Sequence, residues 1–249
     1  MTDITTTWTD RPCPICGENE RITLLALRTI RNEGHNGDFI FEMHDSVCDI
    51  CGFVFNRKIP EPQFLLDYYA DALLLVQPDY DAQSRINVIK NNTPAGGSVL
   101  ELGGARAEFA DLVRAEGFTV TVKEHRDPWP DEIFDTIVAY YVLEHVADPR
   151  GMLLNIRDHL NPGGKVILEV PNFEMWIHSL YREHFNHFTP CHLGLLFYLV
   201  GFVYHPDRRI SRSYGMVAVG ERIPLIPEKT AEIYRTHHAK VGHHWEARL

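Results

Sequence analysis

Four of the five cysteines of this chain form two matched pairs with the spacing of a metal site. Cys13 and Cys16 lie in the run CPICG, and Cys48 and Cys51 lie in the run CDICG, with 31 residues between the pairs. Each CxxCG turn presents two thiolates to one ion, so the two turns together supply the four sulfur ligands that structural zinc prefers. A redox CxxC is the competing interpretation, but thiol exchange needs only one pair. We therefore expect a structural Zn²⁺ with no open position for catalysis, and we expect Cys191 to be a small buried residue.

A second group of residues suited to chemistry lies in the run ELGGA. Glu101 ends an aliphatic run and is followed by the small residues Gly103, Gly104 and Ala105. Small residues between a strand and a helix let a ligand approach the backbone and meet the helix N-terminus. Glu124 ends the next aliphatic run, about 20 residues further on, where such folds place a carboxylate that binds a ribose. The spacing predicts a site for a nucleotide-type cofactor, with solvated strand ends as the alternative for the two acids.

The elements that must position these residues alternate along the middle of the chain. Between Ser98 and Asn172, short aliphatic runs alternate with amphipathic segments, which is typical of βαβ units and a parallel sheet. Phe109, Leu112 and Val113 form the core-facing stripe of a helix that follows the first strand. Further strands are expected at 165–170, 202–205 and 216–219, the last two as an antiparallel hairpin, and further helices at 63–75, 82–91 and 192–199.

Composition and charge limit the class of partner. The chain has 249 residues and a formal charge of −10, from 34 acidic against 24 basic residues. This balance disfavours nucleic acid, because phosphate binding usually needs a basic face. No apolar run reaches the roughly 18–20 residues that span a bilayer, and the N-terminus has no secretory pattern. We expect a cytoplasmic protein with a small-molecule partner and no membrane contact.

Three phrases in residues 98–171 resemble the class I S-adenosylmethionine (SAM)-dependent methyltransferases. They are FDTIV at 134–138, VLEHV at 142–146 and NPGG at 161–164, which are similar to the fourth and fifth strands of that family. The four-cysteine module in front and the run YREH at 181–184 behind resemble the C-methyltransferases of nucleotide-linked keto-sugars. Those enzymes carry a zinc module, a SAM domain and a Tyr-x-Glu-His segment that supplies a catalytic base.

The resemblance implies a Rossmann-like α/β methyltransferase sheet behind a small N-terminal zinc ribbon. The expected organisation is a zinc-binding module at 1–60, a helical linker region at 61–94, a methyltransferase-like domain at 95–222 and a helical, histidine-rich tail at 223–249. SAM is the implied cofactor. Its expected contacts are Glu101, Gly103, Gly104, Ala105, Glu124 and Tyr140, with Glu124 binding the ribose hydroxyls through charge-assisted hydrogen bonds.

The resemblance also assigns a catalytic group. Methylation of a carbon next to a ketone needs a base, and a histidine suits this task because its pKa lies near working pH. His184 is the implied base, Glu183 and Tyr181 orient it or bind the sugar, and His145 faces the substrate. Two alternatives remain for this region: His184 as a packing residue, or a metal site formed from Glu183, His184, His187 and His192. Methylation of oxygen or nitrogen also remains open.

Two departures from the family pattern affect the cofactor site. Alanine stands at 105 and 107, where the family's loop has its second and third glycines, and alanine does not adopt positive φ cheaply. Only nine residues, 125–133, separate Glu124 from Phe134, whereas a parallel crossover needs about a dozen. The third strand and its helix are therefore expected to be missing, with Asp127 or Asp131 as partial substitutes. These departures motivate the alternative function of a catalytically degenerate binding or scaffold protein.

Overall fold

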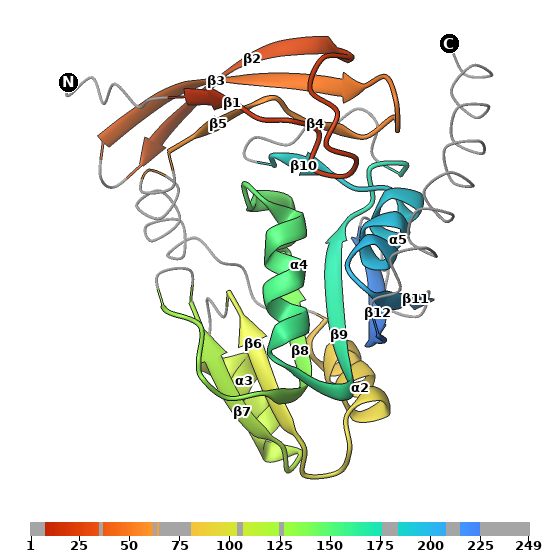
Figure 1. Ribbon diagram of the computed structural model, residues 1–249. Helices are drawn as coiled ribbons and strands as arrows, with labels where there is room; N and C mark the ends of the chain where they lie inside the picture. Colours follow the sequence, from red (N-terminus) through yellow and green to blue (C-terminus); the bar gives the residue numbers. More distant parts are fainter. Residues whose placement is uncertain are drawn as a thin grey trace.

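The computed structural model describes residues 8–34, 37–61, 64, 81–103, 107–124, 127–175, 184–207 and 215–224. These residues form an N-terminal β region that lies across one end of a six-stranded sheet with helices on both of its faces (Figure 1). The helix expected at 63–75 and most of the tail at 223–249 fall outside the described residues. No helix in the described part of the chain has the length and apolar character needed to cross a membrane.

The N-terminal region is built around a long hairpin of β2 (Ile22–Gly34) and β3 (Gly37–Cys48). A four-stranded sheet with the order β10-β4-β3-β2 extends this hairpin. Its strand β4 (Val54–Asn56) pairs with β10 (Asn186–His187), so a segment from late in the chain joins the N-terminal sheet. β1 (Trp8–Asp10) and β5 (Lys58–Pro60) form a separate antiparallel pair.

The larger sheet has the order β11-β12-β9-β8-β6-β7. Its strands are β6 (Ser98–Leu102), β7 (Thr119–Lys123), β8 (Phe134–Tyr140), β9 (Leu160–Pro171), β11 (Phe202–Asp207) and β12 (Gly215–Arg222). The β7-β6-β8-β9 part is parallel, and β11 and β12 form the expected antiparallel hairpin beside β9. β7 is the edge strand, and the described residues between it and β8 contain no strand, so the expected loss of the third strand is confirmed.

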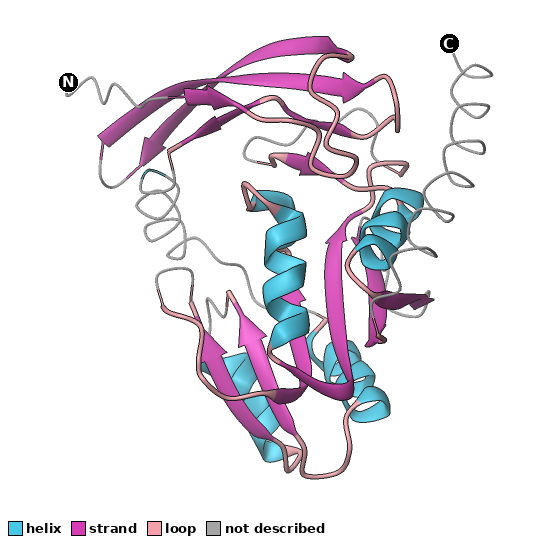
Figure 2. Ribbon diagram, in the orientation of Figure 1, coloured by secondary structure: helices cyan, strands magenta, loops and turns pink. Residues whose placement is uncertain are grey.

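Helices cover the two faces of this sheet (Figure 2). α4 (Pro149–Asp158) and α5 (Pro190–Leu199) contribute to one core cluster, and α2 (Ala82–Asn92) and α3 (Ala107–Ala115) contribute to the other. The sheet strands divide their side chains between the clusters with a period of two residues, as the pleat requires. On β8, for example, Ile137 and Ala139 pack with α4 and α5, whereas Val138 packs with α2 and α3.

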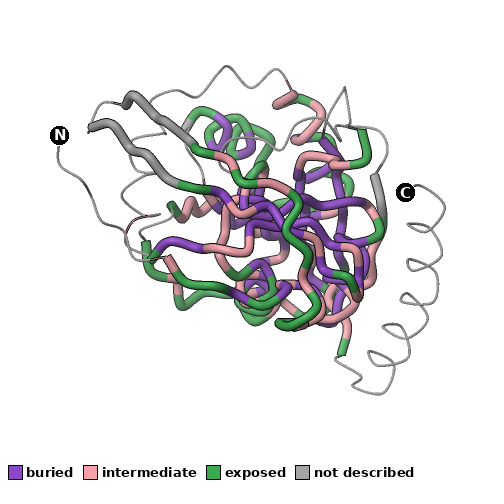
Figure 3. The backbone as a smooth tube through the Cα atoms, turned by 90° about the horizontal axis from the view of Figure 1, so that it is seen from above, coloured by how far each residue is buried: buried purple, intermediate pink, exposed green. Residues whose placement is uncertain are grey.

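The α4 and α5 core continues without a break into the N-terminal β region. Cys13, Cys48 and Cys51 belong to the same buried cluster as the α5 side chains. Phe53 follows the second CxxCG turn and stacks at an angle on Phe188, with 5.3 Å between ring centroids. Figure 3 shows the buried stretches of backbone gathered toward the middle of the molecule, with exposed stretches around them. Anything that disturbs the cysteine cluster acts directly on the core that supports α5.

Two packing expectations were wrong. Leu112 is 48% exposed, because α3 buries Phe109, Ala110 and Val113 and turns Leu112 toward solvent. Cys191 is exposed rather than buried, because it is a first-turn residue of α5 whose neighbour His192 faces the core. The strand expected at 165–170 is also longer than predicted, since β9 already begins at Leu160.

Candidate functional site

The four cysteines predicted to bind metal come together in one buried cluster. The Sγ atoms of Cys13 and Cys51 lie 3.5 Å apart, and those of Cys16 and Cys48 also lie 3.5 Å apart. A tetrahedral Zn²⁺ with Zn–S bonds of about 2.3 Å places its sulfur ligands about 3.8 Å apart. The donor set and its spacing therefore fit a structural zinc ion, and the thiolates fill all four of its positions.

Two tight turns hold the cysteines in place. The amide of Gly17 donates to the carbonyl of Cys13, and the amide of Gly52 donates to the carbonyl of Cys48, each at 2.8 Å. Gly17 has φ +77° and Gly52 has φ +71°, a conformation that side chains other than glycine disfavour. The CxxCG spacing is therefore a local property of the chain, which explains why the sequence alone located this site.

A cavity of about 320 Å³ opens at the carboxyl ends of the parallel strands. Open α/β sheets bind their ligands at this edge. The cavity is lined by Gly103 just after β6, by Glu124 just after β7, and by residues of α4 and its N-cap that include Asp148 and Met152. Gly103 has φ +70°, and its amide donates to the carbonyl of Lys123 at 2.9 Å, which ties the end of β6 to the end of the parallel strand β7. Gly104 and Ala105 lie outside the described residues.

The segment that replaces the third strand forms one wall of this cavity. Trp129 lines the cavity and stacks on His159, with ring centroids 4.6 Å apart. Asp127 closes a turn, because its Oδ2 atom accepts a hydrogen bond from the amide of Glu124 at 2.9 Å. Asp127 was among the residues expected from the sequence to contribute here and Trp129 was not, although a tryptophan stands out within a nine-residue connection.

Glu101 and Tyr140 do not line the cavity, although both were expected to contact a cofactor. Glu101 is 7% exposed on β6, in register with Val138 of β8. Tyr140 packs edge to face with Phe109 at 5.5 Å, and the guanidinium of Arg85 lies 4.5 Å from its ring centroid.

A polar network follows Tyr140 at the end of β8. Tyr141 has φ +55°, an uncommon conformation for a bulky residue, and its hydroxyl donates to Glu169 at 3.0 Å. Arg85 Nε donates to the other oxygen of Glu169 at 2.8 Å. The chain is thus held through a strained turn before it enters the 3-10 helix η2 (Leu143–His145).

Two histidines that the sequence singled out meet beside this turn. His145 ends η2, His184 lies two residues before β10, and their ring centroids lie 4.8 Å apart at an interplanar angle of 76°. Burial, together with the neighbouring His145 and His187, lowers the pKa of His184 to about 2. The imidazole is therefore neutral at working pH, but its pKa is well below working pH and not near it as expected from the sequence. Tyr181 and Glu183 lie outside the described residues.

Glu144 is a functional candidate that was not predicted from the sequence. The run VLEHV supported the family resemblance, but it gave Glu144 no role of its own. Its side chain is 1% exposed, and its Oε1 atom lies 3.8 Å from His145 Nε2. Burial raises the pKa of Glu144 to about 8. Glu144, His145 and His184 bring one ligand atom each to within 4.8 Å of one another, a geometry that can hold a metal ion.

The alternative metal set of Glu183, His184, His187 and His192 includes Glu183, which lies outside the described residues, and two of its histidines have other partners. His192 uses both ring nitrogens elsewhere: its Nε2 donates to the carbonyl of Cys51 at 2.9 Å, and its Nδ1 accepts from Thr189 at 2.8 Å. His187 is paired with Asp45, whose Oδ1 lies 3.9 Å from His187 Nε2. His192 therefore connects the cysteine cluster to α5 and is not available to a second metal.

Comparisons with solved structures identify the same fold. A Burkholderia thailandensis 1,6-didemethyltoxoflavin-N1-methyltransferase, solved with 1,6-didemethyltoxoflavin and S-adenosylhomocysteine, aligns with a TM-score of 0.51 at 15% identity, covering 66% of this chain and 87% of its own. CalS10, an amino pentose methyltransferase from Micromonospora echinaspora, aligns with a TM-score of 0.44 at 14% identity, covering 64% of this chain and 97% of its own. At these identities the first alignment shows the fold alone, and the second is too distant to add to it.

Sequence comparisons establish the family. None of the curated proteins matches this chain. A family model described as a methyltransferase domain matches residues 76–206, which is more than half of the chain. The matched residues contain the parallel strands, the cavity at their carboxyl ends and both histidines of the pair. The chain therefore belongs to the methyltransferase-domain family and is a SAM-dependent methyltransferase.

Proposed function

We propose that this methyltransferase transfers the methyl group of SAM to a carbon next to the carbonyl of a nucleotide-linked keto-sugar. The single observation that carries the acceptor part is the pair of His145 and His184 beside the cavity. Val142 and Val146, which flank η2, both line the cavity, and His145 directly precedes Val146. The ring of His184 lies 4.8 Å from the ring of His145. The amino-terminal cysteines hold a structural Zn²⁺ in this proposal and take no part in the reaction.

The cavity at the ends of β6 and β7 suits the adenosine part of SAM. Glu124 is exposed at its rim and accepts the ribose hydroxyls, Gly103 lets the ligand approach the backbone, and Trp129 supplies an aromatic face for the adenine. Glu101, buried one residue before the turn, supports the loop near the methionine part. SAM supplies an electrophilic methyl group on a sulfonium.

The residues around the histidine pair supply the base. His184 is neutral, which is the state that accepts a proton, and it removes the hydrogen from the carbon next to the carbonyl. The carbon then takes the methyl group while the carbon–sulfur bond breaks. The negative charge of the enolate favours the imidazolium that forms, because an opposite charge raises the pKa of a histidine.

The first test is binding of SAM and S-adenosylhomocysteine by calorimetry, with Glu124→Ala as the variant. We expect micromolar binding to wild type and binding about 10- to 100-fold weaker to Glu124→Ala, because hydrogen bonds to a charged group contribute about 1.5–3 kcal/mol. Glu116→Ala is the matched control, since Glu116 pairs with Lys90 in the connection that precedes β7, away from its carboxyl end. Absence of binding to wild type at millimolar ligand would contradict the proposal and favour a binding or scaffold role.

Trp129 gives a second prediction for the same cavity. Trp129→Ala is expected to weaken SAM binding about 10-fold or more, because stacking of a base on an aromatic ring contributes about 1–3 kcal/mol. Trp129→Phe keeps an aromatic face and is expected to retain most of the affinity. Equal affinity of the alanine variant and wild type would show that the segment replacing the third strand does not contact the cofactor.

A further inference from the structure

We propose that Glu144, His145 and His184 bind a divalent transition-metal ion, at a site separate from the four cysteines. One ligand atom from each residue lies within 4.8 Å of the others. Two imidazoles and one carboxylate form a donor set that holds Zn²⁺ or Fe²⁺ in proteins while leaving positions open for a further ligand. The proposal goes beyond the proposed function, because metal binding at this site requires neither SAM nor an acceptor.

The carboxyl of Glu144 is the strongest reason to place a cation here. Glu144 is 1% exposed, and among the described residues neither of its oxygens meets a hydrogen-bond donor. A buried polar group without a partner is costly, and a buried carboxylate is usually paired or bound to a metal. Its Oε1 atom lies 3.8 Å from His145 Nε2, so a small rotation of either side chain brings both atoms to one ion.

The two segments that supply the ligands are tied to each other through their backbones. The amide of Phe185 donates to the carbonyl of Glu144 at 2.8 Å. Asn186 Nδ2 donates to the carbonyls of Leu143 at 3.1 Å and Val146 at 2.8 Å. These bonds fix the distance between the segment that carries Glu144 and His145 and the segment that carries His184. A metal site needs this rigidity.

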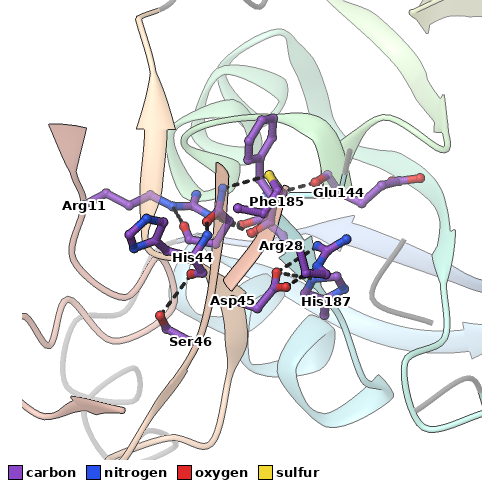
Figure 4. Close-up of polar contacts among 11 residues, drawn as sticks. Arg11, Arg28, His44, Asp45, Ser46, Glu144, Phe185 and His187 are labelled. Atoms are coloured by element: carbon purple, nitrogen blue, oxygen red, sulfur yellow. Dashed lines mark hydrogen bonds and ion pairs between the residues drawn. The ribbon is translucent and has the colours of Figure 1, made fainter. Parts of the chain in front are cut away.

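Arg11 adds a second tie from the N-terminal β region. Its Nη1 donates to the carbonyl of Ala147 and its Nη2 to the carbonyl of Phe185, each at 2.6 Å. Figure 4 shows the Arg11 side chain reaching toward Phe185, with Glu144 beyond it. The site is thus held between the two sheets by contacts between residues far apart in the chain.

The surrounding charges are compatible with a bound cation. The positive charge of Arg28 lies near His184 and weakens the attraction of the site for a cation. Arg28 is paired with Asp45, however: Arg28 Nη2 donates to Asp45 Oδ1 at 2.9 Å. Glu169 acts on Glu144 from the network at the end of β8 and adds negative charge. The side chain of His145 is 19% exposed, which gives an ion a path from solvent to the cluster.

The experiment counts metals on the full-length protein loaded with Co²⁺. All proteins compared carry alanine in place of four histidines near the end of the sequence, so that these side chains bind no metal. The four are His237, His238, His243 and His244. We expect two ions per chain, one with the charge-transfer absorption of thiolate ligands and one with the weaker visible bands of nitrogen and oxygen ligands. Glu144→Gln and His184→Ala are each expected to keep the first ion and bind the second at least about 100-fold more weakly, whereas the exposed His205→Ala variant keeps both.

Two results would overturn the proposal: one ion per chain in the protein with an intact cluster, or two ions per chain in Glu144→Gln. If Glu144→Gln also loses the thiolate-bound ion, it is misfolded, and His145→Gln decides instead because His145 is partly exposed. None of these readouts depends on turnover. If the proposed function also holds, a metal on His184 excludes a proton from the same nitrogen, so occupancy of this site inhibits methyl transfer.

Discussion

Cys51→Ser is expected to release the metal from the cysteine cluster and to lower the melting temperature by about 10–20 °C. Loss of a structural metal ion typically costs about 5 kcal/mol or more, and each kcal/mol corresponds to about 2–4 °C in a chain of this size. The cluster lies inside the main core, with Cys13, Cys48 and Cys51 each no more than 1% exposed. Removal of one thiolate therefore leaves a buried set of sulfur atoms without the ion that neutralises them.

The effect is expected to spread beyond the N-terminal sheet. The carbonyl of Cys51 accepts the hydrogen bond from His192 on α5, and Phe53 packs on both His192 and Phe188. When the CxxCG turn loses its ion, the carbonyl shifts and the first turn of α5 loses its anchor. We therefore expect a single cooperative unfolding transition at lower temperature, not a selective loss of the β2–β3 hairpin.

Zinc content and thermal unfolding, measured on the same samples, test this prediction. Cys191→Ser is the matched control, because Cys191 is exposed and lies outside the cluster. It is expected to keep one cysteine-bound metal and the wild-type melting temperature. A Cys51→Ser variant that retains both metal and melting temperature would show that the cluster is not a metal site.

The sequence predicted those parts of the molecule that depend on local spacing. The CxxCG turns bring their own cysteines together, and the hydrophobic runs that lead up to Glu101 and Glu124 specify parallel strands. The missing third strand followed from counting the nine residues that precede Phe134, because chain length limits what a crossover can contain. In each case neighbours along the chain determine the geometry.

Contacts between distant residues were not predictable in the same way. Arg11 donates to carbonyls 136 and 174 residues away, and no periodicity in the sequence reveals that pairing. β10 is only two residues long and joins the N-terminal sheet by pairing with β4. Glu144 was missed for the same reason, since its importance depends on the approach of His184 from a segment 40 residues later. Leu112 shows a related limit. The helix was predicted correctly, but its period did not specify which of its side chains the neighbouring elements cover.

His184→Ala is expected to reduce methyl transfer to a keto-sugar nucleotide by about 10²- to 10⁴-fold while SAM affinity changes little. The magnitude is that of a general base acting in the transition state. His184 lies against His145 at 4.8 Å, whereas the cavity assigned to the adenosine is lined by Glu124, Trp129 and α4. Loss of the imidazole therefore removes the base and leaves the cofactor contacts in place.

Deuterium exchange separates this role from a packing role. In heavy water without SAM, the wild-type protein is expected to exchange the hydrogen next to the carbonyl of the sugar, and His184→Ala is expected not to. The exposed His205→Ala variant, on β11, serves as the control and should exchange at the wild-type rate. Normal turnover by His184→Ala would contradict the base assignment and favour an oxygen or nitrogen acceptor, which needs positioning more than deprotonation. Slow turnover with normal exchange would instead place His184 in substrate alignment, because the proton would then leave through another group.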